Sequence, residues 1–300
     1  MVQKTVKKSY TFTGKGLHTG AVSRIVVSPA PENTGINFKR ESDGAIIPAL
    51  ATNVSSTARS TKLTVGDFSV QTVEHVLSAL YGLGVDNALI TVDGPEMPIL
   101  DGSARPYVEA ICADGLQDQA AGRKYIDLKE EIYVSDEKSG SWIRITPADK
   151  PSFDLTIDFG SKVLGIQNAS YDESVDYASQ IAVCRTFVFF HEIEYLFANN
   201  LIKGGDVDNA IVVVEHPVTP EQVDNIAAKM GRESMHVNSD GYLSNLSLHF
   251  PNECGRHKLL DLIGDMSLAG GRVNAHITGY KPGHGINTRA AAYILQQIGY

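Results

Sequence analysis

VDNALITVDGP (residues 85–95) and VDNAIVVVEHP (residues 207–217) are two versions of one short pattern. Each begins with an Asp-Asn turn, continues as an apolar stretch of strand length and ends in proline. Two further pairs occur in the same order along the chain: Ser28-Pro29-Ala30 with Thr146-Pro147-Ala148, and Arg59-Ser60 with Arg185-Thr186. We interpret the three pairs as an internal duplication of one structural unit.

Both copies mix strands with helices, which predicts an α+β fold made of two similar two-layer α/β sandwich domains. The polar segment 113–124 has no apolar periodicity and is expected to be the linker, so we place the first domain at 1–120 and the second at 121–300. The second copy carries an insertion at 160–174 and another stretch at about 218–252. We expect these insertions to lie at the surface and to take part in binding.

Composition and charge exclude several classes of protein. The chain of 300 residues is 43% hydrophobic and carries a formal net charge of −9, without a Lys/Arg block, which argues against nucleic-acid binding. No apolar run approaches the roughly 18 to 20 residues of a membrane helix, and no signal-peptide pattern is present, so we expect a cytoplasmic protein. The three cysteines are widely spaced, so a metal would have to be bound by His, Asp or Glu.

GRHKLLDLIGD (255–265) is expected to form an amphipathic helix. At about 100° per residue, its apolar residues fall on one side and His257, Asp261 and Asp265 on the other. A histidine and an aspartate one turn apart can hold a metal ion when a third ligand comes from elsewhere. A solvated polar stripe with one His/Asp contact explains the same pattern and is the more common explanation.

QTVEHVLSALYGLG (71–84) predicts a second amphipathic helix, with Thr72 as its N-cap and Gly82 or Gly84 as its stop. His75 lies in the first turn, where the helix dipole favours the neutral imidazole that a metal ligand requires. Glu74 points about 100° away from His75 and could act as a general base on a nearby water. Capping or surface solvation explains the Glu-His pair equally well.

Two further stretches contain histidine. HEIEY (191–195) begins like the zinc-protease motif HExxH, but Tyr195 replaces the second histidine, so we predict that His191 and Glu192 are helix-surface residues. GYKPGHGIN (279–287) predicts a Gly/Pro-rich loop that presents His284, with Lys281 nearby. Such a loop is either a place of close approach to a ligand or a plain surface turn.

In their order along the chain, six motifs together resemble the UDP-3-O-acyl-N-acetylglucosamine deacetylases, the zinc amidases of lipid A biosynthesis: TVEHVLSALYGLGVDN, DGPEMPILDGSA, CRTFVFFHEIEYL, GGDVDNAIVV, RHKLLDLIGD and GYKPGHGIN. The resemblance covers essentially the whole chain. It implies zinc-dependent hydrolysis of the acetamide of UDP-3-O-acyl-N-acetylglucosamine, which releases acetate. It also implies that the insertion near 160–182 in the second domain forms a hydrophobic passage for the fatty acyl chain.

The same resemblance implies roles for individual residues. His75, His257 and Asp261 would bind zinc, and Glu74 would be the general base. His284 would stabilise the tetrahedral oxyanion and protonate the departing amine.

Further positions of the family's site can be carried over to this chain. Asp265 would orient His284, and Thr186 would donate a hydrogen bond to the oxyanion. The implied substrate-binding residues are Lys258 and Lys281 at the diphosphate, Phe159 stacked on the uracil, Phe187, and His18 near the acyl passage.

Two other functions stay open. Two histidines and a carboxylate also suit a mononuclear non-haem iron enzyme, which would require oxygen and a co-substrate. A solvated polar stripe would instead fit a non-catalytic nucleotide-sugar or lipid-binding protein. Some relatives in the deacetylase family continue into a fused acyl-carrier-protein dehydratase domain, so such a fused or partner domain beyond Tyr300 is a further expectation.

Overall fold

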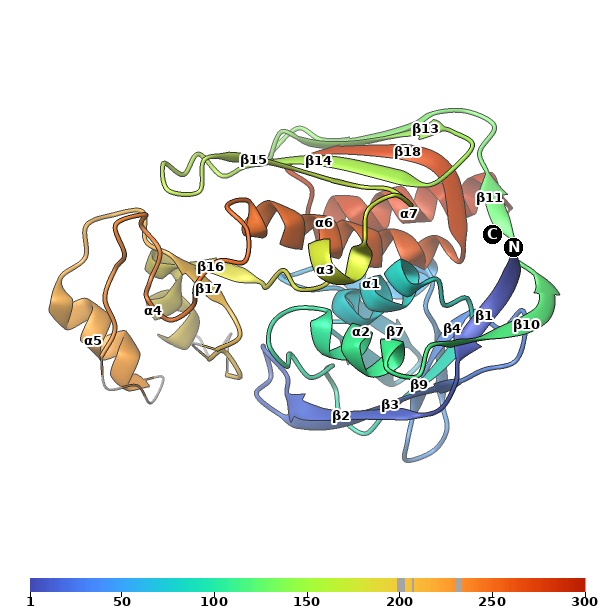
Figure 1. Ribbon diagram of the computed structural model, residues 1–300, viewed down its shortest axis with the longest axis horizontal. Coiled ribbons are helices and arrows are strands. Elements are labelled where there is room, and N and C mark those ends of the chain that lie inside the picture. The colour runs from blue at the N-terminus through green and yellow to red at the C-terminus, as the bar shows by residue number, and fades with distance from the viewer. Residues whose placement is uncertain (199–202, 207, 230–231, 233, 300) are drawn as a thin grey trace.

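The computed structural model describes residues 1–198, 203–206, 208–229, 232 and 234–299. Two mixed β-sheets lie on the outside, and four helices, α1, α2, α6 and α7, are packed between them (Figure 1). A smaller group of elements, labelled β16, β17, α4 and α5, projects from one end. The fold is therefore of the α+β class, as predicted.

The first sheet has the strand order β2 (Tyr10–Lys15), β3 (Val22–Pro29), β9 (Ala88–Val92), β4 (Ile36–Arg40), β5 (Ile46–Pro48). Its central strand β9 runs antiparallel to β3 and parallel to β4. Helix α1 (Glu74–Leu83) precedes β9, and α2 (Arg105–Cys112) follows it. Alternate residues of β3 are buried, because one face of the sheet packs on these helices while the other meets solvent.

The second sheet repeats this arrangement with the order β12 (Ile132–Asp136), β13 (Ser141–Pro147), β18 (Arg272–Tyr280), β14 (Ser152–Asp158), β15 (Ile166–Tyr171). Strand β18 is antiparallel to β13 and parallel to β14. Along the chain it follows α6 (Glu253–Met266) and precedes α7 (His284–Gln297). The units α1–β9–α2 and α6–β18–α7 thus correspond. Pro29 pairs with Ala88 and Pro147 with Ala275, so the Ser/Thr-Pro-Ala match marks equivalent strand ends.

The match between 85–95 and 207–217 does not mark equivalent strands, and that prediction is wrong. Val207 lies outside the described residues, and Ile211–Val213 form β17, which pairs in parallel with β16 (Phe187–Phe189) in a separate small sheet. The counterpart of β9 is β18. A turn followed by a short apolar run suits any buried strand, whereas the pairing partners that define equivalence are distant in sequence.

The expected linker is also a strand. Within 113–124, β10 (Leu116–Gly122) pairs antiparallel with β1 (Val2–Val6) and so ties the start of the chain to its middle. The proposed division at residues 120 and 121 falls inside β10 and stays a prediction. The remaining elements are β6 (Val54–Ser56), β7 (Lys62–Val65), β8 (Phe68–Gln71), β11 (Tyr125–Asp127), α3 (Tyr177–Gln180), α4 (Phe190–Ala198), α5 (Pro220–Lys229), η1 (Ala51–Asn53) and η2 (Ser267–Ala269).

The second copy is longer mainly because of residues 187–243, which we call the insert lobe. It contains β16, α4, β17 and α5, and it has an apolar cluster of its own that includes Phe190, Ile193 and Val212. The expected insertion at 160–174 instead contains the whole of β15, the edge strand of the second sheet. None of the described helices combines the length and apolar character needed to cross a lipid bilayer.

Helices α1 and α6 pack closely against each other in the middle of the molecule. A Cβ atom placed on Gly264 would lie 2.1 Å from the carbonyl oxygen of Glu74, so a glycine is required for this approach. Helix α6 is buried on its polar side as well as its apolar side, and the alternative of a solvated stripe is therefore wrong. Thr72 is not the N-cap of α1, because the helix begins one residue later in the chain, after Val73, while Thr72 donates its hydroxyl to Glu96.

Candidate active site

Three ionisable side chains meet where α1 crosses α6. The Nε2 atoms of His75 and His257 lie 3.7 Å and 3.4 Å from Oδ1 of Asp261, and the two imidazole rings are perpendicular. All three side chains are at most 8% exposed. The i, i+4 spacing on α6 places His257 and Asp261 together, and the packing of α1 adds His75.

The contacts of these three residues fit a bound metal ion. Oδ1 of Asp261 is buried without a hydrogen-bond partner, which is costly unless something else satisfies it. Its Oδ2 accepts a hydrogen bond of 2.9 Å from Lys258. Nδ1 of His257 lies 3.1 Å from the carbonyl of Cys184, which leaves Nε2 as the free ligand atom. Two imidazoles and one carboxylate are the donor set of mononuclear zinc and iron sites.

The protonation states of the ligands suit the same purpose. Burial and the neighbouring His257 lower the pKa of His75 to about 3, so its imidazole is neutral. Although burial alone would raise the pKa of the Asp261 carboxyl, the positive charge of Lys258 holds it below its usual range. The site therefore offers deprotonated ligands at neutral pH, as metal binding requires.

Glu74 and His284 face each other beside the three ligands. Oε1 of Glu74 lies 3.8 Å from Nε2 of His284, and its Oε2 accepts a hydrogen bond of 3.1 Å from the backbone N–H of Thr61. Burial raises the pKa of the Glu74 carboxyl above its ordinary range. His284 is the first residue of α7 rather than part of a loop, so the expected loop is wrong at this position.

Asp265 holds His284 in place. Its Oδ2 accepts hydrogen bonds of 2.9 Å from Nδ1 of His284 and from Asn287, while its Oδ1 accepts one of 2.6 Å from the Thr61 hydroxyl. Burial by itself would lower the pKa of His284, but the charges of Asp265 and Glu74 outweigh it and raise that pKa to about 9. At neutral pH His284 is thus a cation with its Nε2–H directed at the site.

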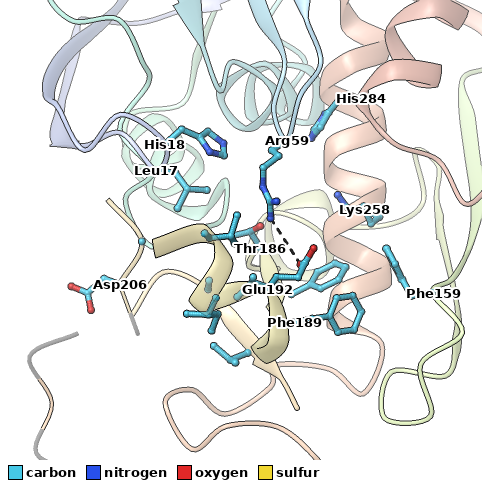
Figure 2. A pocket seen from close by; sticks show the side chains of 17 residues that line it. Leu17, His18, Arg59, Phe159, Thr186, Phe189, Glu192, Asp206, Lys258 and His284 are labelled. Carbon is cyan, nitrogen blue, oxygen red and sulfur yellow. Dashed lines mark ion pairs between the residues drawn. The ribbon is translucent and has the colours of Figure 1, made fainter. Parts of the chain in front are cut away.

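A cavity of about 320 Å³ leads to this centre (Figure 2). His284, Lys258 and Thr186 are among its lining residues, and the insert lobe supplies most of its apolar wall. Backbone hydrogen bonds of 2.8 Å from Thr186 to Gly102 and from Ile211 to Thr186 fix the threonine on this wall. The apolar lining residues are Leu17, Phe159, Phe187, Val188, Phe189, Ile193, Leu196, Ala210 and Val212.

The expected substrate-binding residues are not all at this cavity. Lys258, Phe159, Phe187 and His18 line it, and Phe159 packs edge-on against Phe187 with ring centres 5.5 Å apart. Lys281 is not among the lining residues; its Nζ lies 3.4 Å from Asp158, at the end of β18.

The expected passage at 160–182 is wrong, since no lining residue comes from that range. Most of the apolar wall comes from 187–196 and 210–212, and Leu17 and Phe159 complete it. Much of 160–182 is taken up by β15 and α3, whose side chains pack on the sheet and helices.

Arg59 lines the cavity, although the sequence marked it only as one of the matched residues of the duplication. It adopts a left-handed backbone conformation with φ of 67°, and its guanidinium extends across the cavity to within 3.9 Å of Glu192 (Figure 2). Glu192 is therefore a cavity residue, and its prediction as a plain helix-surface residue is wrong. The only local signal was a lone cation in the polar stretch SSTARST. Thr61 donates hydrogen bonds to both Glu74 and Asp265, and the sequence around it gave no signal of this role.

The fold and the site define a class of protein. A buried two-histidine, one-carboxylate centre with a separate carboxylate beside it, set between two similar α+β halves, is the arrangement of a mononuclear metal-dependent hydrolase. The family model described as UDP-3-O-acyl N-acetylglycosamine deacetylase matches residues 3–227 and 226–296, and the chain belongs to this family. The resemblance of its motifs to the deacetylases is thereby confirmed.

Individual relatives agree with the family assignment. The chain is 46% identical to the bifunctional enzyme LpxC/FabZ of Porphyromonas gingivalis and 42% identical to that of Bacteroides thetaiotaomicron, over 99% of its length in both cases. It spans 64% and 65% of those two relatives, just under two thirds. It is 39% identical to the UDP-3-O-acyl-N-acetylglucosamine deacetylase of Saccharophagus degradans, covering 98% of this chain and 90% of that relative.

Proposed function

We propose that this protein hydrolyses the acetamide of UDP-3-O-acyl-N-acetylglucosamine, releasing acetate and the free amine, as a step of lipid A biosynthesis. The observation that carries the proposal is the buried cluster of His75, His257 and Asp261, with Glu74 and His284 beside it and an apolar cavity leading to it. Membership of the deacetylase family supports it. The same membership disfavours a non-catalytic binding protein.

We propose zinc as the metal, held by His75, His257 and Asp261. Bound there, zinc would act as a Lewis acid on the amide carbonyl and would make a water molecule acidic enough to attack it near neutral pH. Lys258 neutralises one oxygen of Asp261 and so fixes which oxygen is free to bind. Cys184 fixes the ring of His257 through its carbonyl.

Glu74 is the proposed general base. One of its oxygens is held by Thr61, and the other is directed into the site toward His284. Its raised pKa makes the carboxylate a stronger base than one in water, so it can take the proton of the attacking water.

His284 is the proposed electrostatic partner and general acid. Its imidazolium would stabilise the negative charge that develops on the carbonyl oxygen, and its Nε2–H would then go to the departing amine nitrogen. Thr186, on the wall of the inner cavity, would donate its hydroxyl to the same oxygen. Each proton is thus accounted for: Glu74 takes one from water, and His284 gives one to the amine.

The apolar cavity is the proposed site of the fatty acyl chain. Phe187 and the apolar residues of α4 would contact the chain, and His18 lies at the same cavity. Lys258 and Phe159 are proposed contacts of the polar part of the substrate, and Lys281 would reach a diphosphate only after leaving Asp158.

The decisive experiment follows acetate release from UDP-3-O-acyl-N-acetylglucosamine. We expect turnover to stop with a chelator and to return with zinc, also under anaerobic conditions, since an iron oxygenase would need oxygen. The Asp261→Asn variant should fold but lose the metal, because a carboxylate ligand is gone. Chelator-resistant turnover, or a full complement of zinc in Asp261→Asn, would show that the ligand assignment is wrong.

We also propose the setting in which the chain works. Its three cysteines are free, as is usual for a reducing compartment, which supports the cytoplasm. The two bifunctional relatives are longer than this chain, which supports a dehydratase domain as a fused or separate partner. Purifying the protein from its native cells and measuring its mass and its fractionation would test both proposals.

A further inference from the structure

We propose that His191, Glu215 and His216 form a second metal site, at the surface of the insert lobe. Their ligand atoms lie within 4.8 Å of one another, and Nδ1 of His191 is 3.9 Å from Oε2 of Glu215. The His191 and His216 rings have their centres 5.9 Å apart. Two imidazoles and one carboxylate select a divalent transition metal such as zinc or nickel over magnesium or calcium.

The backbone of the insert lobe brings these residues together. Strands β16 and β17 lie side by side (Figure 1). They are parallel, with Phe189 opposite Val213. His191 and Glu215 each follow their strand by two residues, so both leave the small sheet at the same edge. The cluster therefore results from strand register and does not depend on a chance arrangement of side chains.

The orientation of His191 is also fixed. Its ring stacks on Phe189 at an interplanar angle of 21°, with the ring centres 5.6 Å apart. His191 is also the second residue of α4, so its backbone is held by the helix. A ring whose plane is restricted in this way loses less side-chain freedom when it binds a metal.

A metal at this site would join the start of α4 to the end of β17. Both elements form the wall of the cavity, since Phe189, Glu192 and Ile193 come from one side of the join and Val212 from the other. The site would therefore add a link between two segments that the pairing of β16 with β17 and the apolar cluster of the insert lobe keep in contact. It is distinct from the buried centre and does not rest on the proposed function.

The test uses the full chain with its buried centre filled with zinc, dialysed against Zn²⁺ alone. We expect one further equivalent of zinc in the wild type and a rise in melting temperature, because the ion binds only the folded state. Glu215→Gln and His216→Ala should each weaken this extra binding by at least about tenfold. Mg²⁺ should give neither effect.

Two controls make the result specific. His276→Ala removes an exposed histidine 3.4 Å from Asp154, a surface pair outside the cluster, and should bind zinc like the wild type. Asp261→Asn should lose the buried ion and keep the exposed one. Unchanged zinc binding in Glu215→Gln and His216→Ala, or an equal loss in His276→Ala, would overturn the proposal. Glu215→Gln is nearly isosteric, which keeps the test valid if the alanine variant folds poorly.

Discussion

Two His/Glu/Asp clusters in the described part of the chain have the same kind of donor set and very different surroundings. The ligand side chains of the buried cluster are at most 8% exposed, and hydrogen bonds to Cys184 and Lys258 orient two of them. In the exposed cluster the His191 side chain is 52% accessible, and the position of its members follows from strand register and a ring stack. Burial strengthens electrostatic interactions and excludes water.

This difference in burial and in neighbouring groups indicates which cluster can support chemistry. Only the buried one has a carboxylate and a protonated imidazole beside it, and their pKa values are shifted by burial and by neighbouring charge. The exposed cluster can bind an ion, but solvent would reach that ion from one side.

Glu74→Gln tests the base of the buried site. We expect kcat to fall by about 10²–10⁴, because the amide cannot take a proton, while the zinc content stays unchanged. Glu192→Gln is the control, a carboxylate of the same cavity that pairs with Arg59 away from the ligands, and it should have a far smaller effect. Loss of zinc in Glu74→Gln would mean that this residue belongs to the ligand set.

Asp265→Asn tests whether the negative charge of Asp265 keeps His284 protonated. With a raised pKa of about 9, His284 is protonated below that pH, and activity should be lost as the pH rises through it. Removing the negative charge of Asp265 should return this pKa toward its ordinary value of about 6.5, which lowers the protonated fraction at pH 8 about 30-fold. The pH profile of kcat/KM measures the shift.

The control for this pH effect is Asp154→Asn, which alters the exposed pair with His276 and should leave the alkaline limb in place. An alkaline limb that stays near pH 9 in Asp265→Asn would show that another group is the acid.

Gly264→Ala tests the close approach of α1 and α6. The added methyl would lie 2.1 Å from the carbonyl oxygen of Glu74, so the helices must separate, and we expect a loss of about 1–3 kcal/mol in the free energy of unfolding. Gly285→Ala is the matched control in α7, where the nearest atom would be 3.4 Å away. Urea denaturation measures both. Equal stability in the two variants would contradict this account of the packing.

Substitutions of Arg59 should have the smallest effect. Its ion pair with Glu192 is about 40% exposed on both sides and should contribute only about 0–1 kcal/mol to stability. Its left-handed backbone costs about 1 kcal/mol in any residue with a Cβ. We therefore expect Arg59→Gly to be more stable than Arg59→Ala by about that amount in thermal unfolding. A more stable alanine variant would mean that this conformation carries no strain.

Local patterns predicted much of the molecule. The apolar periodicity of 71–84 and 255–265 correctly indicated α1 and α6, and Gly84 ends α1 in a left-handed conformation. The Ser/Thr-Pro-Ala match correctly indicated the duplication. The helices and the Ser/Thr-Pro-Ala tripeptides are each recognised from residues that are close together in the sequence. The geometry of such short stretches is nearly independent of the rest of the chain.

Pairing and packing could not be predicted in the same way. The second VDNA segment looks like a counterpart of β9, yet its strand β17 pairs with β16, because a strand's place in a sheet depends on distant partners. For the same reason, the wall of the passage was expected from 160–182, whereas most of the apolar wall of the cavity comes from 187–196 and 210–212. His284 was expected in a loop, although glycine and proline before it are equally compatible with the start of a helix.

Local sequence was enough to place His257 and Asp261 on one face of a helix and Glu74 and His75 at the start of another, because helical geometry fixes the direction of each side chain. That these two faces meet could be seen only in the folded molecule. The meeting depends on the small volume of Gly264, on the hydrogen bonds of Thr61 and on the removal of the polar stripe from water. Those conditions arise from atoms far apart in the chain, whose contacts are set by the packing of the whole fold.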